Sequence, residues 1–502
     1  MKHVEIARRA QDARQRGERT VGVLGLGFVG TATAANLARM TQGGKRSFFV
    51  VGVEQDSPSG IAKVDSVEHG RPPIWADDPA LAGVFATACH EPRNLVASTD
   101  PHALAECDVV VCCINLDLVR APGQTEELSM PIEGYERAMR TIGRHLRPGA
   151  LVCVESTLPV GLSDTKLYPA LVAGCRDQGL DVERDPPRYA YCYERVMPGP
   201  GYLDSVNRFP RAYAGIDERS ADLARDFLSS FVDVERYPLW RHKSTRAAEM
   251  AKLLENSYRA VNIAFVEEWA RLAEGAGVDL FDVIHSIRVR KGTHDNLMLP
   301  GLGVGGYCLT KDALLAAYGA EKVLGVRAEL PFSRRAILTN ERMPLRAIEL
   351  ARAHFGGALA GRKAALLGVT YRPGVADTRS SPTETLARAF LKEGASVVAW
   401  DPLVSSCDEM PELAFAPDPR TALRGASVVV LCLPDPLYAR ELPEVLLELV
   451  PTGALVIDPW NVVAPVLAGP LASAGVRIEV FGRGDLGDRT EEKRPKHVGG
   501  PR

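Results

Sequence analysis

Short apolar runs recur along the chain and are separated by longer segments in which apolar residues return every three or four positions. The runs lie at 20–24, 48–53, 109–114, 151–154, 363–369, 396–400, 427–433 and 454–457. Short runs of aliphatic residues bounded by helical segments are typical of the buried strands of parallel sheets. Because the runs fall into two series, the pattern predicts an α/β protein with two doubly wound domains.

One segment between the two series has a different pattern. From Ser244 to Ala276 apolar residues keep a helical spacing over the whole length. A helix of about thirty residues is long for the interior of a globular domain. We therefore expect it to join the two domains and to form part of a helical region through which a homodimer assembles.

These patterns divide the chain into five parts. They are an N-terminal extension at 1–19, a first α/β domain at 20–235, a central helical domain at 236–345, a second α/β domain at 346–484 and a tail at 485–502. The extension alternates charges with few apolar residues, which predicts an exposed helix or a disordered segment. The polar tail, rich in Gly and Pro, is predicted to be disordered.

Composition narrows the classes of partner. The 502 residues are 46% hydrophobic and carry a net charge of −3, which argues against binding to nucleic acid or to an acidic membrane surface. No apolar run is long enough to span a bilayer. The ten cysteines have no paired spacing, which predicts reduced thiols, no metal site and a cytoplasmic location.

A Gly-x-Gly-x-x-Gly turn at 25–30 joins the first apolar run to an Ala-rich helical segment, and the second run ends at Glu54. The glycines allow a pyrophosphate to approach the backbone, and the helix N-terminus supplies amide donors. A carboxylate after the second strand accepts ribose hydroxyls and repels a 2′-phosphate, which favours NAD over NADP. The predicted cofactor contacts are Gly25, Gly27, Phe28, Val29, Gly30 and Glu54. The alternative is a glycine-rich turn without a ligand.

Polar residues follow further strands of this predicted Rossmann-like domain. Asn115 follows the run at 109–114, and Ser156 and Thr157 follow the run at 151–154. Ligands of doubly wound sheets lie beyond the carboxyl ends of strands, so these side chains are candidates for contact with cofactor or substrate. The alternative for each is a helix cap. Glu194, inside an aromatic and apolar run, is a further candidate, with a salt bridge to Arg195 or another base as its alternative.

Residues 300–312 combine glycines with a single cysteine. Gly301, Gly303, Gly305 and Gly306 precede Cys308. Closely spaced glycines indicate a backbone that side chains would obstruct, and a thiol placed after them is a candidate nucleophile. A helix beginning near Tyr307 would place Cys308 at its N-terminus, where the dipole lowers a thiol pKa. The alternative is a glycine-rich turn that leads into a helix with one small buried cysteine.

The long helical segment and a later loop carry the remaining candidates. Lys252 and Asn256 are four residues apart and share one helix face. A solvated surface lysine is the alternative for Lys252. Arg372 and Arg379 lie in a loop that follows the run at 363–369, and guanidinium groups suit the recognition of phosphate.

Six motifs, in order along the chain, resemble those of the UDP-glucose/GDP-mannose dehydrogenase family, the NAD-dependent nucleotide-sugar 6-dehydrogenases. They are GLGFVG at 25–30, ESTLPVG at 155–161, ERVMPG at 194–199, AEMAKLLENSYRAVNIAF at 248–265, GVGGYCLTKD at 303–312 and YRPGVADTRSSP at 371–382. The resemblance extends over about 20–482, nearly the whole chain.

The resemblance implies a role for individual residues. Cys308 falls on the catalytic cysteine of the family, Lys252 and Asn256 on its oxyanion-stabilising pair, and Asp312 on the aspartate that helps to handle water and protons. Thr157 falls on the threonine that orders a catalytic water.

The same resemblance implies the ligand contacts. The residues expected at the sugar substrate are Glu194, Arg195, Lys252, Asn256, Gly303, Gly305, Gly306 and Arg372. Arg372 takes the place of a lysine that contacts the nucleotide sugar, and Arg379 matches an arginine that reaches the NAD site, where Ser156 and Asn115 are also expected.

The activity implied is a four-electron oxidation of the C6 alcohol of a UDP-sugar to the uronic acid, through a thiohemiacetal and a thioester on Cys308. Val304 and Pro198 resemble members that act on N-acetylhexosamines, whereas Tyr307 and Lys311 resemble members that act on glucose. The sugar, with glucose and N-acetylhexosamine as candidates, therefore stays open. The alternatives are a two-electron dehydrogenase on the same scaffold and a non-catalytic sensor of NAD or nucleotide sugar.

Overall fold

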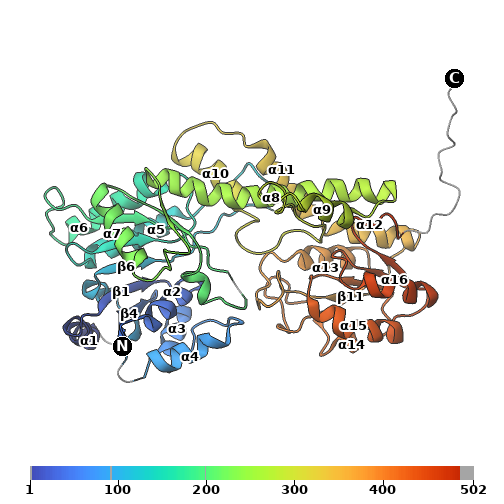
Figure 1. Ribbon diagram of the computed structural model, residues 1–502, viewed down its shortest axis with the longest axis horizontal. Coiled ribbons are helices and arrows are strands. Elements are labelled where there is room, and N and C mark those ends of the chain that lie inside the picture. Colours follow the sequence, from blue (N-terminus) through green and yellow to red (C-terminus); the bar gives the residue numbers. More distant parts are fainter. Residues whose placement is uncertain (1–2, 91–92, 122, 198, 487–502) are drawn as a thin grey trace. The chain divides into compact units, whose positions relative to one another are not determined.

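The computed structural model describes residues 3–90, 93–121, 123–197 and 199–486 (Figure 1). The described chain is a mixed α/β fold with two mainly parallel sheets, which confirms the predicted fold class. It separates into two compact units: unit 1 comprises residues 1–257, 311–334 and 374–376, and unit 2 comprises the rest. Most of the predicted disordered tail, from residue 487 onward, lies outside the described residues.

Unit 1 is built on a sheet of eight strands in the order β10-β9-β8-β7-β6-β1-β4-β5. The strands are β1 (Arg19–Leu24), β4 (Phe48–Val53), β5 (Leu95–Ser98), β6 (Val109–Cys112), β7 (Leu151–Val154), β8 (Arg188–Tyr191), β9 (Arg211–Gly215) and β10 (Leu239–Arg241). Neighbouring strands are parallel except for the antiparallel pair of β8 and β9. The apolar runs predicted β1, β4, β6 and β7, and every residue of the last three is buried.

The strand order of unit 1 reverses at β1, with β4 and β5 on one side of it and β6 to β8 on the other. Loops after the carboxyl ends of β1 and β6 therefore leave the sheet at the position where doubly wound sheets bind ligands. The helices of the unit include α2 (Phe28–Arg39), α3 (Pro58–Glu68), α4 (Pro79–Ala88), α5 (Ile132–His145), α6 (Tyr168–Asp177), α7 (Glu218–Ser229) and α10 (Asp312–Tyr318). Two π-helical turns, η2 (Ser163–Leu167) and η4 (Gly319–Val323), precede α6 and follow α10.

The N-terminal extension is a helix with a buried face. In α1 (His3–Gln15) the side chains of Ile6, Ala10 and Ala13 are fully buried, while Val4 is 80% exposed. Of the two alternatives, a helix is confirmed and disorder is wrong, and the helix is exposed on one face only. Three small or aliphatic residues on one face are enough to pack the helix against the core of unit 1, which the many charges of the segment conceal in the sequence.

Unit 2 contains a second, wholly parallel sheet in the order β13-β12-β11-β14-β15-β16. The strands are β11 (Lys363–Leu367), β12 (Ser396–Trp400), β13 (Ala414–Phe415), β14 (Val428–Leu431), β15 (Leu455–Ile457) and β16 (Arg477–Glu479). Its helices include α9 (Leu280–Arg288), α12 (Leu345–His354), α13 (Pro382–Lys392), α14 (Pro419–Leu423), α15 (Pro436–Leu449) and α16 (Ala464–Ser473), and α11 (Pro331–Arg342) precedes α12. The order reverses at β11, so this sheet also is doubly wound.

The long helix α8 spans Thr245–Ala276 and is labelled in Figure 1. Its predicted bounds differ from the observed ones by one residue. The division between the units falls within it, after Ser257, so α8 is the long central helix that the sequence predicts. None of the helices in the described chain combines the length and apolar content needed to cross a bilayer.

Candidate functional site

The turn between β1 and α2 lies at the carboxyl end of β1. Gly25 has a φ of +89°, and its N–H donates to the Val53 carbonyl at 2.9 Å. A Cβ on Gly30 would lie 1.8 Å from the Gly25 oxygen, so α2 packs on the turn only without a side chain there. Gly27, the N-cap of α2, has open space where its Cβ would stand. The helix N-terminus therefore leaves room for a pyrophosphate beside its amides.

Glu54 directly follows β4, and its side chain is 10% exposed. Its Oε1 accepts hydrogen bonds from the Leu26 amide at 2.6 Å and from Lys63 Nζ at 2.8 Å. These donors hold the carboxylate beside the glycine turn. Phe28 and Val29 begin α2, and the ring of Phe28 packs 4.8 Å from that of Tyr202, whose hydroxyl donates to the Phe28 carbonyl. The residues present therefore fit the adenosine half of a dinucleotide.

Ser156 and Thr157 follow β7, and Asn115 follows β6. Ser156 Oγ donates to the Ile114 carbonyl at 2.5 Å and accepts from the Tyr135 hydroxyl at 2.9 Å, which ties the ends of the two strands together. Asn115 is exposed and its Nδ2 donates to Asp117 at 2.9 Å, and Thr157 is half-buried. The helices that follow begin later in the chain, so helix capping does not account for these residues.

Four further predicted site residues of unit 1 pair with one another: Lys252 and Asn256 lie one turn apart on α8, Glu194 follows β8 and Asp312 begins α10. Lys252 is 7% exposed, which excludes a solvated surface lysine. Its Nζ donates to the Glu194 carbonyl at 3.0 Å and lies 3.8 Å from Glu194 Oε1. Asn256 Nδ2 donates to Asp312 Oδ2 at 2.5 Å. The helix face that the spacing predicts therefore holds both acidic residues.

Asp312 is 1% exposed. Burial raises the pKa of its carboxyl group, while the charges of Lys311 and Lys252 and the hydrogen bond from Asn256 oppose the rise. Asp312 Oδ1 has no hydrogen-bond partner among the described residues, and Lys311 Nζ lies 4.0 Å away from it. A buried carboxylate oxygen without a donor is rare unless a water or ligand completes it. Asp312 is therefore placed to hold or accept a proton.

Two buried features near these residues were missed by the sequence analysis. Lys311 is 7% exposed and donates to the Leu116 carbonyl, in the loop after β6, at 3.3 Å. Glu155 and Arg211 form an ion pair at 3.2 Å with side-chain exposures of 1% and 0%. Burial raises the pKa of Glu155, and Arg211 opposes the rise. The available signal for Glu155 was a charged residue placed directly after a wholly apolar strand.

Arg195, predicted to bind substrate, is engaged by protein groups. Its Nη2 lies 2.9 Å from Glu255 Oε2, and its guanidinium carbon lies 5.2 Å from the centre of the Tyr193 ring. The alternative for Glu194 was a salt bridge to Arg195 or another base, and in the structure the base that approaches it is Lys252, at 3.8 Å. Pro198, which bears on the choice of sugar, lies outside the described residues.

Cys308 lies in unit 2 and is exposed. The predicted helix start near Tyr307 was wrong, because α10 begins only at Asp312 and Cys308 lies in the turn before it. Cys308 therefore does not lie in the first turn of α10. Cys308 is also not the small buried cysteine of the alternative interpretation.

The glycines before Cys308 are required by packing within unit 2. A Cβ on Gly305 would lie 2.7 Å from Tyr371 Cβ, and one on Gly306 would lie 2.8 Å from the Tyr371 ring. Gly301 faces Trp460, whose ring carbon would be 2.1 Å from an added Cβ. Gly303 has a φ of +123°, which side chains disfavour. At Gly305 and Gly306, the close approach that the glycines indicated is therefore made by the loop that begins at Tyr371.

That loop carries both predicted phosphate-binding arginines. Arg379 forms paired hydrogen bonds with Asp377, the shorter at 2.6 Å, and its guanidinium carbon lies 5.5 Å from the centre of the Tyr307 ring. Arg372 is exposed. Arg379 is thus held beside the neighbour of Cys308, whereas Arg372 extends toward solvent.

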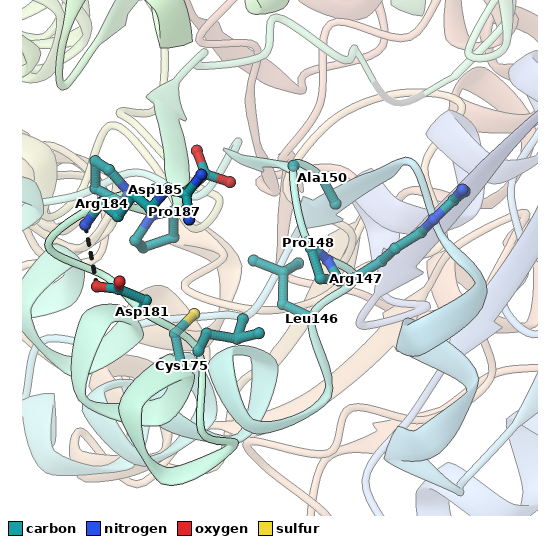
Figure 2. Close-up of a pocket in the computed structure, with 12 residues that line it drawn as sticks. Leu146, Arg147, Pro148, Ala150, Cys175, Asp181, Arg184, Asp185 and Pro187 are labelled. Carbon is teal, nitrogen blue, oxygen red and sulfur yellow. Dashed lines mark hydrogen bonds between the residues drawn. The ribbon is translucent and has the colours of Figure 1, made fainter.

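A cavity of about 490 Å³ lies elsewhere in unit 1 (Figure 2). Its lining includes Arg147 and Ala150 before β7, Pro187 before β8, and Asp181, whose side chain accepts a hydrogen bond from the Arg184 amide at 3.1 Å. These residues precede strands, so the cavity lies at the amino edge of the sheet, opposite the glycine turn. In the part of the chain that the structure describes, no group of three or more His, Cys, Asp or Glu side chains is placed to hold a metal ion.

Three domain profiles match the chain. They describe the NAD binding domain (residues 19–225), the central domain (246–342) and the UDP binding domain (365–465) of the UDP-glucose/GDP-mannose dehydrogenase family. The NAD binding domain covers the glycine turn and Glu54, so the cofactor of the chain is NAD.

Relatives and solved structures agree with these matches. The chain is 30% identical over 379 residues to UDP-N-acetyl-D-mannosamine dehydrogenase of Methanocaldococcus jannaschii, which covers 76% of this chain and 78% of the relative. A UDP-D-ManNAc dehydrogenase structure from Pyrococcus horikoshii matches with a TM-score of 0.76 and 26% identity, over 93% of this chain and 100% of that one. A UDP-glucose dehydrogenase structure from Pyrobaculum islandicum gives a TM-score of 0.75 at 25% identity, over 93% and 98% of the two chains.

The two kinds of glycine in the β1–α2 turn predict different mutant phenotypes. Gly27→Ala weakens NADH binding about tenfold or more, because the methyl group occupies the space that a pyrophosphate needs, while stability changes by only about 0.5 kcal/mol. Gly30→Ala lowers both binding and stability, because the turn must move. Fluorescence titration with NADH and thermal unfolding measure the two effects. Equal destabilisation by both substitutions would contradict this assignment.

Proposed function

The chain belongs to the UDP-glucose/GDP-mannose dehydrogenase family, and we propose that it oxidises the C6 primary alcohol of a UDP-sugar to the uronic acid in two successive hydride transfers. The observation that carries the proposal is the buried pairing of Lys252 with Glu194 and of Asn256 with Asp312. All four lie in the unit that contains the NAD-binding turn. A buried ammonium and a half-buried amide are suited to stabilise an oxyanion, and a neighbouring carboxylate is suited to move its proton.

NAD supplies the acceptor for each hydride, so one sugar consumes two NAD. In the first step the C6 hydroxyl gives its proton to Asp312, directly or through water, as the aldehyde forms. Lys252 and Asn256 donate hydrogen bonds to the alkoxide and carbonyl oxygen. Preorganised donors of this kind, in a site that excludes water, contribute about 3–4 kcal/mol each to transition states that carry an oxyanion.

Cys308 provides the covalent chemistry. Its thiolate adds to the aldehyde carbon, and the oxygen takes up a proton to give a thiohemiacetal. Loss of the second hydride and of that proton leaves a thioester, which water hydrolyses to the carboxylate and the free thiol. Thr157 and Asp312 orient and deprotonate that water. Exposure of the thiol supports this role, as does the chain itself, because four residues keep the Cα atoms of Cys308 and Asp312 within ~14 Å.

We propose a UDP-N-acetylhexosamine as the sugar substrate, with UDP-glucose as the second candidate. The relative from Methanocaldococcus jannaschii and the solved structure from Pyrococcus horikoshii are both named for UDP-N-acetyl-D-mannosamine. Val304 in the cysteine loop agrees with that class. The second candidate has support from Tyr307 and Lys311, and from the structural similarity to a UDP-glucose dehydrogenase.

The test is to measure NADH formation with each of six sugar nucleotides as the substrate. They are UDP-N-acetylmannosamine, UDP-N-acetylglucosamine, UDP-N-acetylgalactosamine, UDP-glucose, UDP-galactose and GDP-mannose. We expect one UDP-N-acetylhexosamine to give the highest kcat/KM and two NADH per sugar consumed. One NADH per sugar would identify a two-electron dehydrogenase. Tight binding without reduction of NAD by any of these sugars would identify a sensor.

Cys308→Ala separates the two oxidation steps. We expect the variant to form no uronic acid, because the thioester cannot form, while mass spectrometry detects at most the aldehyde or its hydrate. Cys175→Ala is the matched control, since this buried cysteine lines the cavity at the amino edge of the sheet. Full acid formation by Cys308→Ala would exclude the covalent route.

We also propose a homodimer that forms through α8. Six large apolar side chains on this helix are about half exposed or more, namely Met250, Leu254, Tyr258, Phe265, Trp269 and Leu272. Apolar residues at helical spacing form a stripe that water solvates poorly. Light scattering should give twice the chain mass of 54.3 kDa for the wild type and a lower mass for Leu254→Glu. Leu391→Glu, at a 41% exposed leucine of α13, is the control and should leave the mass unchanged.

A further inference from the structure

Glu249 is a fully buried carboxylate of α8 to which the steps above give no role. Its Oε2 accepts a hydrogen bond from the Gly161 amide at 2.6 Å, and its Oε1 accepts one from the Ser163 amide at 2.9 Å. The two oxygens of one side chain thus hold two amides of the 158–163 segment, which directly follows Thr157. Both partners lie in unit 1.

Glu249 shares a helix face with Lys252 and Asn256, because the three positions are spaced i, i+3 and i+7. Each of these side chains reaches a different segment. Glu249 binds the 158–163 segment, Lys252 binds the Glu194 carbonyl and Asn256 binds Asp312. Helix α8 is therefore fixed to three segments that carry candidate catalytic groups, each through a different polar side chain.

The 158–163 segment also packs against the chain that follows α10. Gly161 has a φ of +88°, and a Cβ there would lie 2.4 Å from Leu324 Cδ2. A Cβ on Gly319, in η4, would lie 2.5 Å from the Val160 amide nitrogen. Close-packed protein interiors have low compressibility and transmit strain. A displacement of the 158–163 segment would therefore also displace the elements packed against it.

We propose that Glu249 is a positioning residue for the reaction, whose ionised carboxylate holds the 158–163 segment, and with it Thr157, in register with Lys252 and Asn256 on α8. The inference rests on the proposed function, because Thr157 and Lys252 matter together only if they serve one reaction. A carboxylate offers two acceptors to the two amides. A carboxylic acid would turn an O–H toward one of them and lose that bond.

The protonation state of Glu249 follows from its surroundings. Burial raises the pKa of its carboxyl group to about 7, against the hydrogen bonds from Ser163 and Gly161. The carboxylate of Asp164, in η2, contributes to the rise and is itself paired with Arg246 of α8 at 2.7 Å. Tyr189 and Tyr191 of β8 also face Glu249 and are neutral, since burial raises their pKa values. As pH falls through about 7, Glu249 gains a proton and the segment loses one of its two anchors.

Glu249→Gln tests the proposal, since it keeps the shape of the side chain and replaces one acceptor by a donor. We expect kcat at pH 8 to fall about tenfold, a typical consequence of misplacing a catalytic group, with KM for the sugar changed much less. The acidic limb of the kcat profile near pH 7 should move or disappear in the variant. Glu249→Asp, which retains a carboxylate, should recover part of kcat and keep an acidic limb.

Glu267→Gln is the matched control. Glu267 is a second buried glutamate of α8, 5% exposed, whose pKa burial also raises, but it pairs with Arg271 in unit 2. Its replacement should leave kcat and the pH profile unchanged. A wild-type kcat and an unchanged acidic limb in Glu249→Gln would overturn the proposal.

A measurement on the wild-type chain covers the case in which Glu249→Gln fails to fold. Hydrogen exchange of the peptide that contains Gly161 and Ser163, corrected for the intrinsic pH dependence, should show protection rising as pH increases from 6 to 8. Protection that does not change with pH would overturn the proposal. This measurement needs no substrate, so a wild-type chain that oxidises no sugar would refute the proposed function and still leave the hold of Glu249 on the segment measurable.

Discussion

Burying charged side chains at one edge of a mainly parallel sheet is the constraint on which the arrangement of unit 1 depends. A buried ion costs several kcal/mol unless donors or an opposite charge compensate it. Glu155 finds Arg211 of β9, Glu249 finds two amides of the 158–163 segment, and Asp312 finds Asn256. Each compensating group comes from a different element. The strands, α8 and the start of α10 therefore have to meet at this edge for the charges to be buried at all.

The buried charges are not fully compensated at the residues that we expect to take part in the reaction. Both oxygens of Glu249 are hydrogen-bonded, whereas Asp312 Oδ1 has no donor within the described chain. The pKa of each carboxyl is raised by burial, so ionising either of them at neutral pH works against folding. A protein commonly retains this cost in folding free energy at a functional site, where a substrate or water completes the missing contact. At the same edge of the sheet, one carboxylate thus has both oxygens bonded by backbone amides, and the other keeps one oxygen without a donor in the described chain.

The sequence predicted the elements in which apolar residues recur regularly over the whole length. It missed elements whose buried charges pair with residues far away in the sequence. Central strands such as β6 and the full length of α8 follow from runs of apolar residues. Strand β9 begins with a fully buried arginine, Arg211, and local sequence carries no sign of Glu155, the acid that pairs with it. The candidate site shows the same limit. The spacing of Lys252 and Asn256 revealed their common face, but only the fold reveals which groups they meet.

The turn before α10 shows why one wrong prediction is informative. A helix beginning at Tyr307 would have placed Cys308 and Asp312 four residues apart on one face, so both would be exposed or both buried. The tasks proposed for them demand opposite surroundings, because a nucleophile has to be reached by its substrate while a carboxyl with a raised pKa requires burial. Because α10 begins at Asp312 and not at Tyr307, Cys308 lies in an exposed turn while Asp312 is 1% exposed. Gly305 and Gly306 allow this path by letting Tyr371 pack on the backbone, and in this way they would serve the proposed nucleophile indirectly.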